Sequence, residues 1–283
     1  MASELNRESY EALAYGITLG LLYDAKVSCI HVVNPSPIDV IKETFHIGSA
    51  KYGEALRQAI EESENLLYHI VDIIARELGV GEVDIDLKIV TGTLSDSIMN
   101  RAVELDADLV VIGTESGSKF SRTPHTNLAL NMIKHEKANV LLVPSGFKLE
   151  RIEQIGAFID YNENDIDFIK SMIKHAKKTE NAAKLIHVIE SEKNVEKAKH
   201  WQKEFETLFS NDIQQNNVAF YLEIGKVDTI VNSLKNKFGI DMMVIRAYHR
   251  HWSIFSSSSS FSEKVITNIK SPLMVCKTIP IHT

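Results

Sequence analysis

The stretch VTGTLSDSIMNRAVELDADLVVIGT, residues 90–114, has a counterpart in the second half of the same chain. The segment Gly92–Val140 lies over Gly225–Leu273 without a gap, at a constant offset of 133 residues. Upstream of that segment the offset is 156 residues, which places His31 over His187. The sequence therefore predicts a duplicated unit, in which every functional position can be compared between two copies.

Short β-branched runs alternate with amphipathic helical patterns in both halves. In the first half the expected strands are 27–33, 83–90, 108–112 and 140–143, and the expected helices are 5–24, 51–78, 94–105 and 127–137. In the second half the expected strands are 155–159, 184–189, 219–223, 242–245 and 273–276, and the helices are 164–177, 193–209, 227–238 and 260–269. This alternation predicts an α/β fold with parallel strands, right-handed crossovers and helices on both faces.

The boundary between the two copies is expected just after the strand at 140–143. Pro144, Ser145 and Gly146 interrupt the pattern there. We therefore predict one domain at 1–147 and a second at 148–283. The two offsets differ by 23 residues, so the first half carries that many extra residues between its second and third strands, mostly within 34–51.

One strand of the first half lacks room in the sequence. The second half opens with the strand IGAFID, 155–160, whereas only Met1–Ser3 precede Glu4, the counterpart of Asp160. The first strand of a doubly wound sheet is central, so its loss would leave its neighbours without backbone partners. We expect this strand to be missing or truncated: either the true start lies upstream, or the first three residues form a stub.

Composition favours an ordinary globular protein without nucleic-acid or membrane partners. The chain has 283 residues with a formal net charge of -7, and its Lys and Arg residues are scattered. Cys29 and Cys276 lie in apolar runs, which indicates buried inert thiols. No signal peptide or membrane helix is indicated, so a cytoplasmic location is expected.

Five motifs together resemble the universal stress protein (UspA-like) family in its tandem, two-domain form. They are the opening stretch, ANVLLVP at 138–144, CIHVVNP at 29–35, KLIHVIE at 184–190 and SFSEKVITNIKSPLMVCK at 260–277. The resemblance implies two tandem doubly wound five-stranded parallel sheets of order 3-2-1-4-5, as in adenine nucleotide α-hydrolase-like folds. It implies no catalytic chemistry, and it implies pairing through the last strands. Some members of the family bind ATP and others do not.

The family's nucleotide-binding form has an Asp ending the first strand, a Val after the His of the second strand, and Gly-x2-Gly-x9-Gly-Ser/Thr after the fourth strand. Its glycines let backbone amides approach phosphate oxygens at a helix N-terminus. Carried onto the first half, these positions are Glu4, Val32, Gly113, Ser116, Thr126 and Asn127. Only Val32 and Gly113 match, although a local shift of the loop would bring Gly117 into use.

In the second half the same positions are Asp160, Val188, Arg246, His249, Ser259 and Ser260. Asp160, Val188 and Ser260 match, whereas no glycine stands at any of the three glycine positions. The residues that would bind adenosine are kept, whereas the glycines that would bind phosphate are lost. Arg246 and His249, with Arg250, could bind an anion through their side chains, which would be a different site. A metal at YHRHWS, 248–253, is disfavoured because the intervening cation opposes it.

We therefore expect a non-enzymatic stress-response protein that acts as a structural or interaction module with degraded nucleotide pockets. We expect neither a catalytic residue nor a metal, and no cofactor, with ATP as the alternative. The alternative function is binding of ATP, or of another adenine nucleotide or anion, in the pocket of the first domain; a weak ATPase ranks third. The last strands, 140–143 and 273–276, are expected to pair within the chain, a homodimer stays open, and protein partners are unknown.

Overall fold

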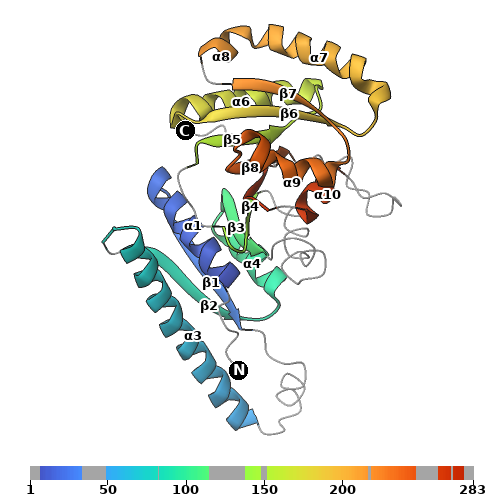
Figure 1. The fold of residues 1–283 in the computed structure, drawn as a ribbon. Helices are drawn as coiled ribbons and strands as arrows, with labels where there is room; N and C mark the ends of the chain where they lie inside the picture. Colours follow the sequence, from blue (N-terminus) through green and yellow to red (C-terminus); the bar gives the residue numbers. More distant parts are fainter. Residues whose placement is uncertain are drawn as a thin grey trace. The chain divides into compact units, whose positions relative to one another are not determined.

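The computed structural model describes residues 7–33, 49–81, 83–114, 138–147, 152–215, 218–246, 261–268 and 270–276. The chain divides into two compact units, Met1–Ala107 and Asp108–Thr283. Each unit is an α/β layer structure (Figure 1). The predicted α/β class with a mostly parallel sheet is confirmed. The helix predicted at 127–137 and most of the segment 34–51 lie outside the described residues.

The first unit contains one parallel pair of strands with helices on both sides. Its elements are α1 (Arg7–Tyr23), β1 (Val27–Val33), α3 (Ser49–Glu77), β2 (Ile85–Thr91) and α4 (Leu94–Glu104). Ile17 of α1 and Ile74 of α3 are buried in one cluster against which Leu87 packs. The next residue of β2, Lys88, contacts Glu104 of α4. Because successive side chains of a strand point to opposite faces, α4 covers the face opposite α1 and α3.

The second unit is built on a seven-stranded sheet of order β3-β4-β9-β8-β5-β6-β7. Its strands are β3 (Leu109–Thr114), β4 (Asn139–Pro144), β5 (Gln154–Phe158), β6 (Ala182–Ile189), β7 (Val218–Ile224), β8 (Met242–Arg246) and β9 (Leu273–Cys276). Its helices are α6 (Glu163–Thr179), α7 (Val195–Leu208), α8 (Ser210–Gln215), α9 (Val227–Phe238) and α10 (Phe261–Thr267), with a 3-10 turn at Glu192–Asn194.

Helices cover both faces of this sheet. Phe220 of β7 lies against Phe209, which directly follows α7, whereas the next residue, Tyr221, lies against Phe238 of α9 with ring centroids 4.5 Å apart. The alternation of side chains along the strand therefore places α7 and α9 on opposite faces. Along the sheet, β7-β6-β5-β8-β9 follows the order third, second, first, fourth and fifth strand of the second half.

The strands of the first half are distributed differently from the two separate five-stranded sheets that were expected. β1 and β2 form a sheet of their own, whereas β3 and β4 extend the sheet of the second half. The compact units consequently divide between Ala107 and Asp108. Among the described residues, no strand bonds to β1 on one side and to β3 on the other. The predicted domains, 1–147 and 148–283, stay a prediction.

Strand register is the same in both halves at the two sequence offsets. His31 of β1 lies opposite Ile89 of β2, and their counterparts His187 and Leu222 lie opposite each other on β6 and β7. The fourth and fifth strands repeat their register in the same way. This agreement is what a duplicated unit predicts.

The last strands of the two halves pair with each other, as expected. β4 and β9 are antiparallel, and Leu141 lies opposite Met274, its own counterpart at the offset of 133 residues. The flanking pairs are Val140 with Val275 and Leu142 with Leu273. The pairing is therefore centred on equivalent positions, as in a two-fold interface between identical subunits.

Equivalent glycines shape the turn after the third strand in both halves. Gly92 has a φ of 147° and Gly225 a φ of 142°. The Gly92 N–H donates to the Val33 carbonyl oxygen at 3.3 Å, and the Gly225 N–H donates to that of Ile189 at 2.9 Å. Only glycine adopts this φ without strain. Each glycine thus ties the end of the third strand to the end of the second.

Both thiols are expected to be unreactive in the folded protein. Cys276 is buried and Cys29 is half-buried, and desolvation raises the pKa of both thiols to about 12. Since the thiolate is the reactive form, both should resist a disulfide reagent at about pH 8, near the pKa of a free thiol, and react once their unit unfolds. Stopped-flow thiol titration with and without urea checks this. A thiol that reacts in the native protein at the rate of a free cysteine would contradict the burial.

Replacing Gly92 by alanine should destabilise the first unit by about 1 kcal/mol or more, because the φ of 147° strains any side chain. The new Cβ would also lie 3.2 Å from Ser97 Oγ. The urea dependence of Cys29 reactivity measures the loss. Gly81→Ala is the matched control, because its Cβ would meet nothing within 4 Å and the expected change is under about 0.5 kcal/mol. Equal losses of stability for the two variants would show that the φ of Gly92 is not the cause.

Candidate functional site

The candidate site lies at the carboxyl ends of β5 and β8 in the second unit. From β5 the chain continues to β6 on one side, whereas β8 lies on the other side. Such a switch point is where open α/β sheets bind ligands. Asp160 follows β5 and Arg246 ends β8, so two of the predicted site residues lie at this point.

The loop after β5 is fixed by a capping box at the start of α6. Asp165 Oδ2 accepts hydrogen bonds from the N–H groups of Asp160 at 2.8 Å and Asn162 at 3.2 Å. Asn162 Oδ1 in turn accepts from the N–H of Asn164 at 2.9 Å. These hydrogen bonds engage backbone N–H groups around the start of α6. Such groups would otherwise be available to bind an anion. The N–H groups of Asp160, Asn162 and Asn164 are therefore bonded to the protein's own side chains.

Arg246 crosses the switch point. Its Nη1 donates a hydrogen bond to the carbonyl oxygen of Asn164 in the first turn of α6. Arg246 lies opposite Cys276, as Gly113 lies opposite Val143 in the first half. The two positions are thus equivalent, and a long cationic side chain in the second half replaces the glycine of the first.

Tyr161 is a site residue that sequence reasoning missed. It has a φ of 55° and is 6% exposed. Its ring centroid lies 4.9 Å from that of His187 and 5.2 Å from that of Phe205. Burial, and secondarily the charge of Glu206, raises the pKa of Tyr161. Its hydroxyl has no hydrogen-bond partner within the described part of the chain. The sequence does not predict the positive φ of Tyr161, the residue that follows Asp160.

His187 joins the second strand to the first. Its Nδ1 lies 2.8 Å from the carbonyl oxygen of Ile159, and since that oxygen only accepts, Nδ1 donates. Asp160 Oδ1 is 3.8 Å from the same nitrogen. Val188, the next residue, is half-buried and its side chain points to the opposite face of the sheet. The histidine thus has the structural role expected from its repetition in both halves.

A second charged pair lies at the carboxyl edge. Lys264 of α10 contacts Glu190, which follows β6, with Nζ 2.9 Å from Oε1. The hydrogen bond from Lys264 holds the pKa of Glu190 below its usual value. Both residues belong to the family motifs quoted above. They are 74 residues apart in the sequence, so the sequence did not predict their contact. This lysine is therefore engaged with a carboxylate.

The remaining predicted site residues are only partly within the described chain. Val32 is buried at the end of β1 in the first unit, and Gly113 belongs to β3 in the second. The others lie outside the described residues: Glu4, Ser116, Gly117, Thr126, Asn127, His249, Ser259 and Ser260. Among described residues, no group of three His, Cys, Asp or Glu side chains could hold a metal ion. None of the described helices is long and apolar enough to span a membrane.

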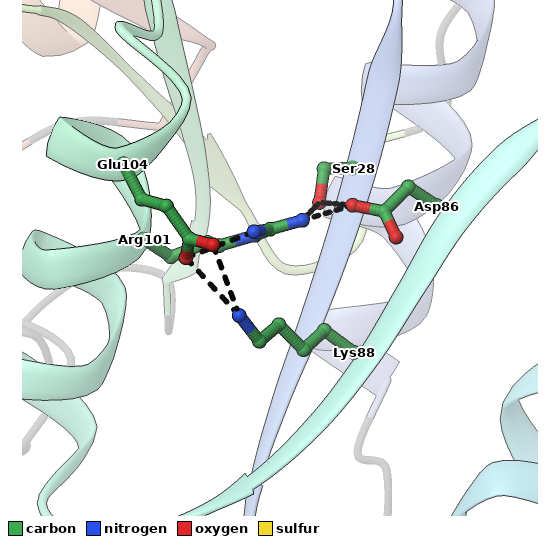
Figure 2. A network of polar contacts seen from close by, with 5 residues as sticks. All are labelled: Ser28, Asp86, Lys88, Arg101 and Glu104. Carbon is green, nitrogen blue, oxygen red and sulfur yellow. Dashed lines mark hydrogen bonds and ion pairs between the residues drawn. The ribbon is translucent and has the colours of Figure 1, made fainter.

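The other cluster of charged side chains is a polar network between α4 and the β1–β2 pair (Figure 2). Arg101 donates to Asp86, and to Ser28 Oγ at 3.3 Å, and it forms an ion pair of 2.9 Å with Glu104. Lys88 Nζ lies 3.1 Å from Glu104 Oε2. Two cations thus face two carboxylates, so the network is balanced and presents no net charge to a ligand.

The second half has apolar residues at two positions of this network and a lysine, Lys237, at a third. The counterpart of Arg101 is Leu234, which is 0% exposed in α9. The strand register makes Ala219 the counterpart of Asp86. Arg101 itself keeps 12% of its side chain exposed. Arg101 and Asp86 thus stand where the second half has apolar residues, which indicates a structural role.

Comparison with known proteins supports one family. The model of the universal stress protein family matches residues 2–144. A universal stress protein from Archaeoglobus fulgidus is 15% identical with a TM-score of 0.66, covering 97% of this chain and 94% of its own. A functionally unknown protein from Pseudomonas aeruginosa is 14% identical with a TM-score of 0.57, covering 93% and 86%. No curated protein matches. At these identities the solved structures establish the fold alone.

Replacing the Arg101–Asp86 pair by the residues of the second half should stabilise the first unit. Arg101→Leu with Asp86→Ala is expected to raise its free energy of unfolding by about 1 kcal/mol, because apolar packing often outperforms a partly desolvated ion pair. Arg101→Ala alone should lower it by about 1–2 kcal/mol, since it removes hydrogen bonds to a charged donor. Urea titration followed through Cys29 reactivity measures both.

Lys88→Gln serves as the control for this pair of variants. It breaks the exposed contact with Glu104, which should change stability by at most about 1 kcal/mol. A double variant that is less stable than Arg101→Ala would show that the network does more than replace packing.

Proposed function

The chain belongs to the universal stress protein family, and on that premise we propose that it is a tandem, non-enzymatic stress-response protein with degraded nucleotide pockets. It acts as a structural or interaction module and requires no cofactor. Its two free cysteines, Cys29 and Cys276, fit a reducing compartment, which favours the cytoplasm.

Arg246 is the observation that carries this proposal. In the nucleotide-binding form of the family, the equivalent glycine lets phosphate oxygens approach the backbone. Here a guanidinium extends from the end of β8 to the first turn of α6. Asp165 engages the amides of Asp160 and Asn162 in the adjoining loop. Together these contacts support the loss of phosphate binding in the second half, because they engage groups that would otherwise face an anion.

Other described side chains of the candidate site do not support catalysis. His187 donates to a backbone carbonyl, and Lys264 is paired with Glu190. Tyr161 has a raised pKa and a buried ring, so its hydroxyl stays protonated and inaccessible. A general base needs both access to substrate and a pKa near the working pH. None of these described groups satisfies both conditions.

Binding of ATP, or of another adenine nucleotide, in the first half is the alternative. Gly113 favours it, because the position equivalent to Arg246 carries no side chain there. The two functions differ in one measurable respect, the presence of a nucleotide on the native protein.

Native mass spectrometry of the purified chain should show the mass of the protein alone, and added ATP should not shift its melting temperature. A ligand at about 100 times its Kd would stabilise the fold by about 2.7 kcal/mol, which is easily measured. The Arg246→Gly variant should behave in the same way, because the other glycine positions are also lost.

Retained ATP would overturn the proposal, and two variants would then locate it. Loss of ATP in Gly113→Arg would assign binding to the first half, whereas loss in Asp160→Ala would assign it to the second. Phosphate release that disappears in Gly113→Arg would establish a weak ATPase instead.

A further inference from the structure

α7 has a second apolar side, which the sheet does not cover. Ala198 and Phe205 of this helix are buried, and α7 packs on β7. Trp201 and Leu208 are large apolar side chains of the same helix, yet they are 42% and 59% exposed. They are separated by two helical turns, so they lie on one side of the helix. α7 therefore presents an exposed apolar side as well as a buried one.

Two charged side chains share the exposed side of α7. Lys197 and Glu204 are exposed, and together with Trp201 and Leu208 they follow the spacing i, i+4, i+7 and i+11. Residues with this spacing face the partner helix in paired helices. We call these four residues the α7 stripe. Among the described residues, neither Lys197 nor Glu204 forms an ion pair, so both charges are available to a partner.

The charges of α7 are complementary to those of the same helix in the reverse direction. Residues 195–201 contain two lysines and one glutamate, whereas residues 202–208 contain one lysine and two glutamates. An antiparallel second α7 therefore places each half of the helix against a half of opposite net charge. When Lys197 lies opposite Glu204 of the second copy, two-fold symmetry repeats the same contact in reverse. The two Trp201 side chains then lie beside each other near the two-fold axis.

α7 lies at the end of the sheet that is farthest from the connection to the first unit. The chain enters the seven-stranded sheet at β3, whereas α7 packs on β7 at the opposite end. Because α7 has only 14 residues, a contact between two such helices is small. Interfaces below about 1,200 Å² are typical of weak complexes. A dimer formed in this way is thus expected to be weak and to depend on concentration.

We propose that α7 forms a two-fold, antiparallel contact with α7 of a second copy of this chain. Lys197 of each copy pairs with Glu204 of the other, and Trp201 of both copies lies at the centre. The self-complementary charges of the helix favour a second copy over an unrelated partner. This inference goes beyond the proposed function, and it holds whether or not the chain binds a nucleotide.

Sedimentation equilibrium of the full chain, between about 1 µM and 1 mM, should show a monomer–dimer equilibrium with a Kd of about 1–100 µM. Lys197→Glu and Glu204→Lys each place like charges opposite each other twice in the dimer, so each should raise the Kd about tenfold or more. Lys226→Glu is the matched control, because it makes the same charge change at an exposed position next to α9, on the other face of the sheet. Salt screens such a distant charge, so the Kd should stay within about twofold.

The two single variants should bind each other. In a mixture of Lys197→Glu and Glu204→Lys chains, every contact between positions 197 and 204 joins opposite charges, so a mixed dimer should form with a Kd close to that of the unmodified chain. The double variant that carries both substitutions restores the same pairing within one sequence and should dimerise equally well. Only an antiparallel contact between two copies of α7 explains this rescue.

Three results would overturn the proposal: a chain that stays monomeric over this range, a dimer that the stripe variants weaken no more than Lys226→Glu does, or single variants that do not bind each other. If one single variant does not fold, the double variant decides the question, because loss of its dimer would contradict the antiparallel register. ATP binding is measured separately, so failure here is distinguishable from failure of the proposed function.

Discussion

Backbone hydrogen bonding along the central strand is the constraint on which the structure depends. In the second half β5 bonds to β6 on one side and to β8 on the other, so five strands form one sheet. In the first half no described strand takes this position, and the four remaining strands belong to two sheets. Among the described residues, β1 and β2 therefore form one sheet, whereas β3 and β4 continue another. Hydrogen bonds between strands hold a sheet together, and the compact units divide in the same place.

The sequence predicted register and turns more reliably than partners. The two offsets placed His31 over His187 and Gly92 over Gly225, and the structure gives these pairs the same neighbours or the same φ. Periodicity identifies a strand because burial alternates along it. Periodicity does not say which strand lies beside it. The seven-stranded sheet was therefore not predictable, and neither was the contact of Arg246 with Asn164, which joins residues 82 positions apart.

The site changed between the copies while the strand ends stayed the same. Gly113 and Arg246 occupy the same register position, although one is a glycine and the other a long cation. Register is set by main-chain bonds and buried side chains, so a residue at the carboxyl end can change without moving the strand. A site residue is thus free to vary where a core residue is not. This explains why the strands of the two halves align in sequence. The site residues differ, because Gly113 is kept only in the first half and Asp160 only in the second.

Pairing of β4 with β9 limits where the chain can meet other molecules. Val140 and Leu142 of β4 are fully buried in that contact, so the last strands are no longer available for a dimer of the kind that two single domains would form. Any partner must use another surface. The end strands of the sheet differ in this respect: β7, VAFYLEI, carries Glu223, which is paired with Lys237, whereas β3, LVVIGT, contains no charge. Charged side chains on an edge oppose unwanted strand pairing. Within the described residues, the β7 end of the sheet thus carries a charged pair that opposes strand addition.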